Sequence, residues 1–231
     1  MQISGMIKST LVDFPKLLSC VLFVPGCNYD CFFCHNRTLI TGEECALNMD
    51  KIDSFLRKRV NFLDGVVISG GEPTLQPGLI DYMKHLKTLG YKVKLDTNGS
   101  QPEIIQDILN QGLCDYFAVD YKCPESKYTQ YCGKLVDAEK VLHTINLLNE
   151  AEVQFEVRTT VFPQLTLEDL KTMAHELPIV PKYILNKYNI PENYRPEAAP
   201  LVFMEPHNPN ELKAYRMALK EYQPNIESLP N

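Results

Sequence analysis

Three of the chain's eight cysteines lie within eight residues, in the run Cys27-Asn28-Tyr29-Asp30-Cys31-Phe32-Phe33-Cys34. Thiolates this close on one short loop cannot all pair with one another as disulfides, and they are soft ligands suited to zinc or to an iron–sulfur cluster. A structural zinc site usually takes four protein ligands in two separated pairs, and no second C-x2-C follows downstream. A four-iron cluster held by three cysteines would leave one iron open to a reactant.

Two other interpretations of these cysteines fit the sequence less well than the cluster. Cysteines are often buried apolar residues or scattered free thiols, but three at this spacing after an apolar run argue against that. A zinc site could use His35 as its fourth ligand. His35 directly follows Cys34, which makes it hard for ring and sulfur to face one ion, so we favour the cluster.

Composition narrows the class of protein. The chain has 231 residues, 45% of them hydrophobic and 23% charged, which is typical of a soluble globular protein. The net charge of −6 argues against non-specific binding of nucleic acid. No apolar run is long enough for a membrane span, and the first residues do not form a signal peptide. With eight cysteines, a leaderless chain of this kind is expected in a reducing cytoplasm, with no nucleic-acid or membrane partner.

The other five cysteines show no ligand spacing, so a second cluster is not indicated; they are Cys20, Cys45, Cys114, Cys123 and Cys132.

Apolar runs alternate with helical patterns along the chain. After a short hairpin or extended lead-in over residues 1–18, we expect strands at 19–24, 66–68, 91–95, 116–119, 153–161 and 183–185. We expect helices at 50–59, 78–89, 102–111, 136–150 and one opened by Thr166. Six strand–helix repeats predict an α/β fold with a parallel sheet and right-handed crossovers.

We expect one domain over residues 1–231, with its core at about 17–187 and a C-terminal extension at 188–231. The extension is rich in proline, which indicates an irregular wrap over the surface. One helix is predicted in it, with Asn208 as the N-cap and Pro209 as the first residue. The stripe Leu212, Tyr215, Leu219 and Tyr222 is expected to pack on its own domain.

Unusual polar residues follow the predicted strands at their carboxyl ends. They are the cysteine loop, Gly70-Gly71-Glu72, Asp96-Thr97-Asn98, then Asp120 and Lys122, with Arg158 inside the fifth strand. In parallel α/β folds and barrels, ligands bind at this edge. One charged residue at a strand end is usually solvated, but such groups at five successive strands indicate a ligand site. The glycines let backbone approach closely, and Glu72 offers an acceptor to an ammonium group.

The C-x3-C-x2-C run with Phe33 before its third cysteine, together with Gly70-Gly71-Glu72-Pro73, resembles the radical S-adenosylmethionine (SAM) enzymes. The resemblance implies a partial (β/α)6 TIM-type barrel and a [4Fe–4S] cluster held by Cys27, Cys31 and Cys34. The cluster and SAM would carry the chemistry, with no catalytic side chain. The remaining implied SAM-site residues are Phe33 near the adenine, Glu72, Lys122 and Arg158 at the polar ends of SAM, and Gly70, Gly71, Asp96, Asn98 and Asp120.

A narrower resemblance is to the activating enzymes of glycyl radical proteins, above all the longer activating protein of anaerobic ribonucleoside-triphosphate reductase. It covers about residues 1–178 and rests on Ser9–Pro15, Gly26–Asn28, Cys34–Asn36, Ser69–Gln76, Leu95–Gly99, Val119–Lys122 and Arg158–Val161. Lys16 stands where that family usually has glycine, and Phe32 replaces a common proline. Tyr194-Arg195-Pro196 is a displaced form of the family's usual ending.

This resemblance implies reductive cleavage of SAM and removal of a hydrogen atom from a glycine of a partner protein, with the anaerobic ribonucleotide reductase as the expected partner. It also implies an electron donor of the flavodoxin or ferredoxin type. Asp96, Thr97 and Asp120 resemble the ligands of a monovalent cation known in some activating enzymes, since a hard cation prefers oxygen. His35 and Asn36 are expected to face the incoming peptide.

Two alternatives stay open. One is a radical SAM enzyme acting on a small molecule, such as a 7-carboxy-7-deazaguanine synthase, which would need a closed pocket and Mg²⁺. The lead-in Asp13-Phe14-Pro15 and the run Cys34-His35-Asn36 favour the activating enzyme instead. The other is a non-catalytic metal-binding scaffold, which leaves the charged residues at the strand ends unexplained.

Overall fold

The computed structural model describes residues 1–41, 45–133 and 136–228. Strands β1 to β8 follow one another across the sheet in chain order, and β1 and β8 are its edges among the described residues, so the sheet is open, as in a partial barrel. The chain divides into two units. Unit 1 comprises Met1–Asn28, Thr38–Thr97 and Glu103–Ala118, and unit 2 comprises Tyr29–Arg37, Asn98–Pro102 and Val119–Asn231.

Unit 1 carries the first half of the strand–helix alternation. Its strands are β1 (Gly5–Thr10), β2 (Ser19–Val24), β3 (Gly65–Gly70) and β4 (Lys92–Thr97), followed by the first residues of β5 (Tyr116–Asp120). Its helices are α2 (Met49–Arg59), α3 (Leu79–Thr88), the short η1 (Pro73–Leu75), and all but the first residues of α1 (Arg37–Thr41) and α4 (Pro102–Asn110). The strand β1 pairs antiparallel with β2, while β2, β3 and β4 are parallel. Of the two forms expected for the lead-in over residues 1–18, the extended one is present, because its single strand β1 pairs with β2 beyond it.

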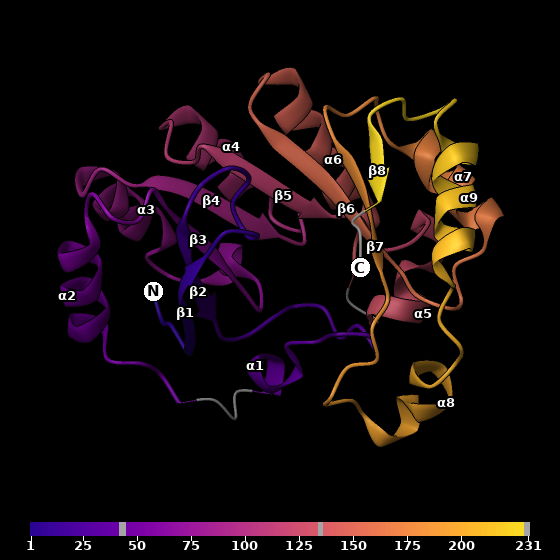
Figure 1. The fold of residues 1–231 in the computed structure, drawn as a ribbon, viewed down its shortest axis with the longest axis horizontal. Coiled ribbons are helices and arrows are strands. Elements are labelled where there is room, and N and C mark those ends of the chain that lie inside the picture. The colour runs from indigo at the N-terminus through magenta and orange to yellow at the C-terminus, as the bar shows by residue number, and fades with distance from the viewer. Residues whose placement is uncertain (42–44, 134–135, 229–231) are drawn as a thin grey trace. The chain divides into compact units, whose positions relative to one another are not determined.

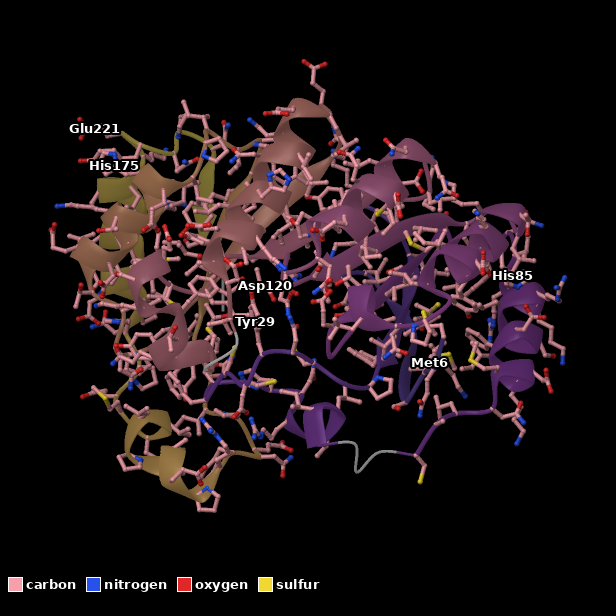
Figure 2. The ribbon with its side chains drawn as sticks, turned by 180° about the vertical axis from the view of Figure 1, so that it is seen from behind. Met6, Tyr29, His85, Asp120, His175 and Glu221 are labelled. Carbon is pink, nitrogen blue, oxygen red and sulfur yellow. The ribbon has the colours of Figure 1, made fainter. Side chains whose placement is uncertain are left out.

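Helices α2 and α3 lie side by side on unit 1 (Figure 1). Asn48 caps α2 by accepting a hydrogen bond from the backbone of Lys51, as its sequence position predicts. His85 of α3, labelled in Figure 2, lies with its Nε2 2.5 Å from Oδ1 of Asp53 on α2. Between these helices and the sheet lie fully buried apolar side chains, which hold β3 and β4 in place: Leu56, Val66, Ile68, Met83, Leu86, Val93 and Leu95.

Unit 2 carries the second half. It holds the end of β5, then α5 (Tyr128–Cys132), α6 (Ala138–Glu150), β6 (Phe155–Val161), α7 (Leu167–Glu176), β7 (Tyr183–Lys187), α8 (Ala199–Val202), α9 (Pro209–Leu219) and β8 (Ile226–Ser228), with short 3₁₀ turns η2 (Glu125–Lys127) and η3 (Pro196–Ala198). Strands β6, β7 and β8 are parallel neighbours. Thr166 forms a capping box with Asp169 at the start of α7.

The C-terminal extension is more ordered than an irregular wrap. Asn208 and Glu211 form a capping box at the start of α9, as predicted, and α9 lies beside α7 and β8 (Figure 1). Leu212 and Leu219 of the predicted stripe are buried within unit 2. The strand β8 was not expected from the sequence: three residues add to the edge of β7.

The six strands expected for the parallel sheet are all present as β2 to β7, and the α/β fold class is confirmed. The expectation of a single domain stays a prediction. In the part of the chain that the structure describes, no helix is both long and apolar enough to cross a membrane.

Candidate functional site

In unit 1, the two glycines that follow β3 bring the segment before the cysteine loop against the turn. A Cβ on Gly71 would lie 1.9 Å from the carbonyl oxygen of Gly26, and one on Gly70, whose φ is +118°, would lie 2.5 Å from the nitrogen of Val24. Gly71 N–H donates to the oxygen of Val24 (2.8 Å), and Glu72 N–H donates to that of Gly26 (2.7 Å). The glycines are therefore required by the chain's own backbone, which leads directly into Cys27.

Glu72 is fully buried at the end of this turn. Its Oε1 accepts hydrogen bonds from the backbone N–H of Thr74 (3.1 Å), from the hydroxyl of Thr74 (2.6 Å) and from the hydroxyl of Thr97 at the end of β4 (2.7 Å). These three donors fix the orientation of the carboxyl group.

Asp96 near the end of β4 is paired with a lysine that sequence reasoning missed. The ammonium of Lys94 donates to Oδ1 of Asp96, and Ser69 Oγ donates to its Oδ2 at 3.1 Å. Lys94 is only 1% exposed, and its Nζ lies 6.0 Å from the ring centroid of Tyr116. Strand alternation was the available signal, because residues two apart on a strand share a face.

In unit 2, the rest of the cysteine loop is anchored on α5. Asp30 N–H donates to the oxygen of Cys132 at 2.7 Å, and Cys34 N–H donates to that of Cys31 at 3.2 Å. The thiol of Cys132 hydrogen-bonds that of Cys31, and this contact, followed by burial, raises the pKa of Cys31. Burial, followed by the charge of Cys31, raises the pKa of Cys34. Thiols are soft ligands, and each loses its proton when its sulfur binds a cationic metal. The chemistry of Cys31 and Cys34 therefore fits that of ligands to an iron–sulfur cluster.

Aromatic rings hold the middle of the same loop. Phe33 stacks on Phe162 with ring centroids 4.6 Å apart and an interplanar angle of 22°, and Phe32 meets both rings edge-on. The Nζ of Lys122 lies 5.9 Å from the Phe33 ring centroid. Phe32 thus packs in an aromatic cluster. A role of Phe33 near an adenine stays a prediction.

Asp120, labelled in Figure 2 where β5 ends, organises two cations of unit 2. Its Oδ1 accepts from Nε of Arg158 at 3.0 Å, and its Oδ2 from Nζ of Lys122 at 3.3 Å. Burial by itself would raise the pKa of Asp120, but the charges of Arg158 and Lys122 outweigh it and the pKa is lowered. The backbone N–H of Lys122, two residues beyond the end of β5, also donates to the hydroxyl of Tyr128 at 3.0 Å.

Three further predicted residues of unit 2 have distinct surroundings. Asn98 is buried, and its Oδ1 accepts from the backbone of Ser100 at 2.9 Å. His35 is exposed and Asn36 half-buried. Whether they meet a peptide stays a prediction.

The structure also connects the C-terminal extension to the cysteine loop. Arg195 Nη1 lies 2.9 Å from Oδ2 of Asp30, whose Oδ1 accepts from Arg37. This link was not predicted, although Arg195 belongs to the displaced Tyr194-Arg195-Pro196 run.

The predicted site residues divide between the units. Cys27, Gly70, Gly71, Glu72, Asp96 and Thr97 belong to unit 1, whereas Cys31, Phe33, Cys34, Asn98, Asp120, Lys122 and Arg158 belong to unit 2. Among the residues that the structure describes, no three His, Cys, Asp or Glu side chains are already gathered as a metal site. The set of three cluster cysteines stays a prediction that rests on their spacing and chemistry.

Comparison with known proteins identifies the family to which these features belong. The family model described as "Radical SAM superfamily" matches residues 21–177. The chain is 33% identical over 230 residues to the "Putative glycyl-radical enzyme activating enzyme MJ1227" of Methanocaldococcus jannaschii, covering 97% of this chain and 94% of that protein. It is 27% identical over 170 residues to the 7-carboxy-7-deazaguanine synthase of Thermococcus kodakarensis, covering 64% and 66%.

Solved structures share the fold at low sequence identity. Streptococcus suis SuiB bound to S-adenosylmethionine aligns with a TM-score of 0.70 at 15% identity, over 91% of this chain and 52% of SuiB. A TYW1 structure with a lysine-pyruvate adduct aligns with a TM-score of 0.61 at 20% identity, over 89% and 73%. The chain thus spans about half the length of SuiB, and these likenesses concern the fold alone.

Proposed function

This chain belongs to the radical SAM superfamily, and on that premise we propose that it is an activating enzyme that generates a glycyl radical on a partner protein, the anaerobic ribonucleoside-triphosphate reductase. Membership of the family implies a [4Fe–4S] cluster and SAM as cofactors. The observation that carries the proposal is the similarity to the M. jannaschii relative, because it extends over nearly the full length of both chains.

When bound, the reduced cluster supplies the electron that splits SAM into methionine and a 5′-deoxyadenosyl radical, which removes a hydrogen atom from a glycine Cα. The side chains of the protein would bind the cluster and SAM and orient them relative to each other. Cys27, Cys31 and Cys34 would hold the cluster as thiolates, and the raised pKa values of Cys31 and Cys34 mean that iron must displace their protons.

Glu72 would accept the ammonium group of SAM. Its full burial and its hydrogen bonds from Thr74 and Thr97 support this role, because they fix the carboxyl group in one orientation. A charge-assisted hydrogen bond from an ammonium is stronger in such a setting than at an exposed surface.

Lys122 and Arg158 would hold the carboxylate and other polar ends of SAM. Both are already ordered by Asp120, so little side-chain freedom remains to be lost when a ligand binds. Phe33 is held in its aromatic cluster. The proposed SAM-binding set is completed by Asn98, Gly70, Gly71, Asp96 and Asp120.

The test is transfer of a label from the partner's glycine. The chain is reconstituted with iron and sulfide under argon and given SAM, a reductant and a reductase partner deuterated at the target glycine. We expect deuterium in 5′-deoxyadenosine and a glycyl radical signal by electron paramagnetic resonance. A partner with that glycine replaced by alanine is the matched control. Cleavage of SAM with no transfer of label contradicts the proposal.

The electron donor is proposed to be of the flavodoxin or ferredoxin type. Replacing a chemical reductant by reduced flavodoxin in the same assay should sustain formation of 5′-deoxyadenosine.

The second candidate function is that of a small-molecule radical SAM enzyme. The observation that favours it is the similarity to a 7-carboxy-7-deazaguanine synthase over about two thirds of this chain. It predicts a Mg²⁺-dependent small-molecule product and no glycyl radical. Mass spectrometry for 7-carboxy-7-deazaguanine in the same reactions decides between the two.

A further inference from the structure

Asp96, which the sequence resemblance assigns to the SAM site, is paired in unit 1 with Lys94, a residue for which the sequence predicted no role. Lys94 is 1% exposed, an unusual burial for lysine, and its ammonium donates to the Asp96 carboxylate on its own strand. The ring of Tyr116, with its centroid 6.0 Å from Nζ, adds a favourable electrostatic contact. Ser69 donates to the other carboxylate oxygen.

This pair conflicts with the monovalent cation that the sequence resemblance implies at Asp96, Thr97 and Asp120. A cation bound at Asp96 would share its carboxylate with the Lys94 ammonium, and two positive charges at such short range repel each other. The Asp120 carboxylate already balances two cations within unit 2. The residues present therefore do not fit an additional cation.

We propose that the Lys94 ammonium takes the place of the monovalent cation, so that SAM binding by this chain does not require Na⁺ or K⁺. The proposal rests on the SAM-binding part of the proposed function and is independent of the partner.

The geometry of strand β4 explains how the Lys94 side chain can take the place of a bound cation. Lys94 and Asp96 are two residues apart on a buried strand, so both side chains leave the same face of β4 and the ammonium is held beside the carboxylate by the strand itself. A tethered charge needs no supply from solution, whereas a bound ion must be present at a sufficient concentration. A compact ammonium with three donors is a closer substitute for a small cation than a planar guanidinium.

The first experiment compares salts. SAM affinity of the reconstituted wild-type chain is measured calorimetrically under argon in NaCl, KCl and tetramethylammonium chloride at equal ionic strength. We expect the three dissociation constants to agree within about twofold. A tenfold or greater loss of affinity in tetramethylammonium, recovered by Na⁺ or K⁺, overturns the proposal.

The second experiment removes the Lys94 charge and tests whether SAM binding then depends on Na⁺ or K⁺. Lys94→Met keeps the length of the side chain but removes its charge, and we expect SAM affinity at least tenfold weaker in tetramethylammonium and largely restored by K⁺ or Na⁺. Lys92→Met is the matched control: Lys92 lies on the same strand and pairs with Asp115, but at the surface. The SAM affinity of Lys92→Met should be the same in all three salts. Lys94→Met with equal affinity in all three salts contradicts the proposal.

A third readout does not depend on SAM. Thallium-205 NMR should detect no site-specific Tl⁺ binding to the wild-type chain and a bound signal with Lys94→Met. If Lys94→Met does not fold, the double variant Lys94→Met/Asp96→Asn, which removes both charges, should fold and bind no Tl⁺. Specific Tl⁺ binding to the wild type at Asp96, abolished by Asp96→Asn, rejects the proposal. Failure of glycyl radical formation with normal SAM binding would reject only the activating function.

Discussion

Two carboxylates that follow strands in the two units are surrounded in opposite ways. Glu72 in unit 1 is fully buried, and the donors on its Oε1 are two hydroxyls and one amide. Asp120 in unit 2 is half-buried and holds the cations of Arg158 and Lys122. The hydroxyl and amide donors on Oε1 fix the orientation of Glu72, whereas Asp120 uses its charge to position two cations.

The difference teaches that two acids at strand ends can be prepared for different tasks. An acid oriented by hydroxyl and amide donors suits an ammonium group, and cations ordered by an acid suit a carboxylate. Each of the following predictions tests one side of this comparison, starting with the largest effect.

Each of the cluster cysteines is expected to be indispensable, although one lies in unit 1 and two lie in unit 2. Replacing Cys27, Cys31 or Cys34 by alanine should abolish the iron–sulfur absorbance near ~400 nm after reconstitution, since three thiolates are the least that hold such a cluster. Iron and sulfide analysis gives the second measurement.

The matched control for this loss is Cys132→Ala. Cys132 is buried and its thiol hydrogen-bonds Cys31, so the variant removes a contact of a ligand without removing the ligand itself. Iron content should stay near that of the wild type. Loss of iron in Cys132→Ala, or in the corresponding Cys123 variant, would show that the ligand set is wrong.

Glu72→Gln and Lys122→Met should each weaken SAM binding by an order of magnitude or more while the cluster survives. Each variant loses a charge-assisted hydrogen bond, worth ~1.5–3 kcal/mol. Calorimetry under argon measures the affinity. Unchanged SAM affinity in both variants would contradict the proposed roles of Glu72 and Lys122.

Glu156→Gln is the control that shows whether loss of a buried carboxylate outside the proposed site affects SAM affinity. Glu156 is 5% exposed and pairs with Lys182 at 3.4 Å, but it lies outside the proposed site. It should leave SAM affinity unchanged. If Glu72→Gln behaves like Glu156→Gln, the role of Glu72 as ammonium acceptor is excluded.

The pairing of Asp120 with Arg158 and Lys122 predicts that the stability of the fold depends on pH. Arg158 and Lys122 lower the pKa of Asp120 against the opposing effect of burial, so the folded pKa lies below the unfolded value of about 3.9. The stabilisation is therefore complete above about pH 4 and is lost as pH falls through the folded pKa. The gap in free energy of unfolding between wild type and Asp120→Asn, measured with urea, should shrink from pH 6 to pH 3. A gap that stays constant over this range contradicts the prediction.

Periodicity located the regular elements well. The apolar run 19–24 coincides with β2, and the capping signals at Asn48, Thr166 and Asn208 each open a helix. These features are local in the chain, so a sequence carries them. The strand β8 was missed because three residues form it and its only reason to be extended is the edge of β7.

The candidate site was predictable to the extent that its residues follow strands. Glu72, Asp120, Lys122 and Arg158 could be named from strand order, but not the hydroxyls that orient Glu72 or the direction in which Asp120 uses its charge. Lys94 was missed because a lysine in a strand is ordinarily solvated, and only its 1% exposure reveals the pair with Asp96.

The smallest expected effect lies at Lys16, in the same unit as Glu72 but outside the proposed site. Its φ of +66° is in the left-handed region, where a side chain costs about 1–2 kcal/mol, and related activating enzymes usually have glycine there. Glycine removes this strain but adds ~0.5–1 kcal/mol of unfolded-state entropy. Lys16→Gly should therefore stabilise the chain by about 0.5–1 kcal/mol in urea unfolding, with SAM affinity unchanged. Lys16→Ala, which keeps the strain, should not stabilise it, and a larger gain from Lys16→Ala than from Lys16→Gly would mean that backbone conformation is not the cause.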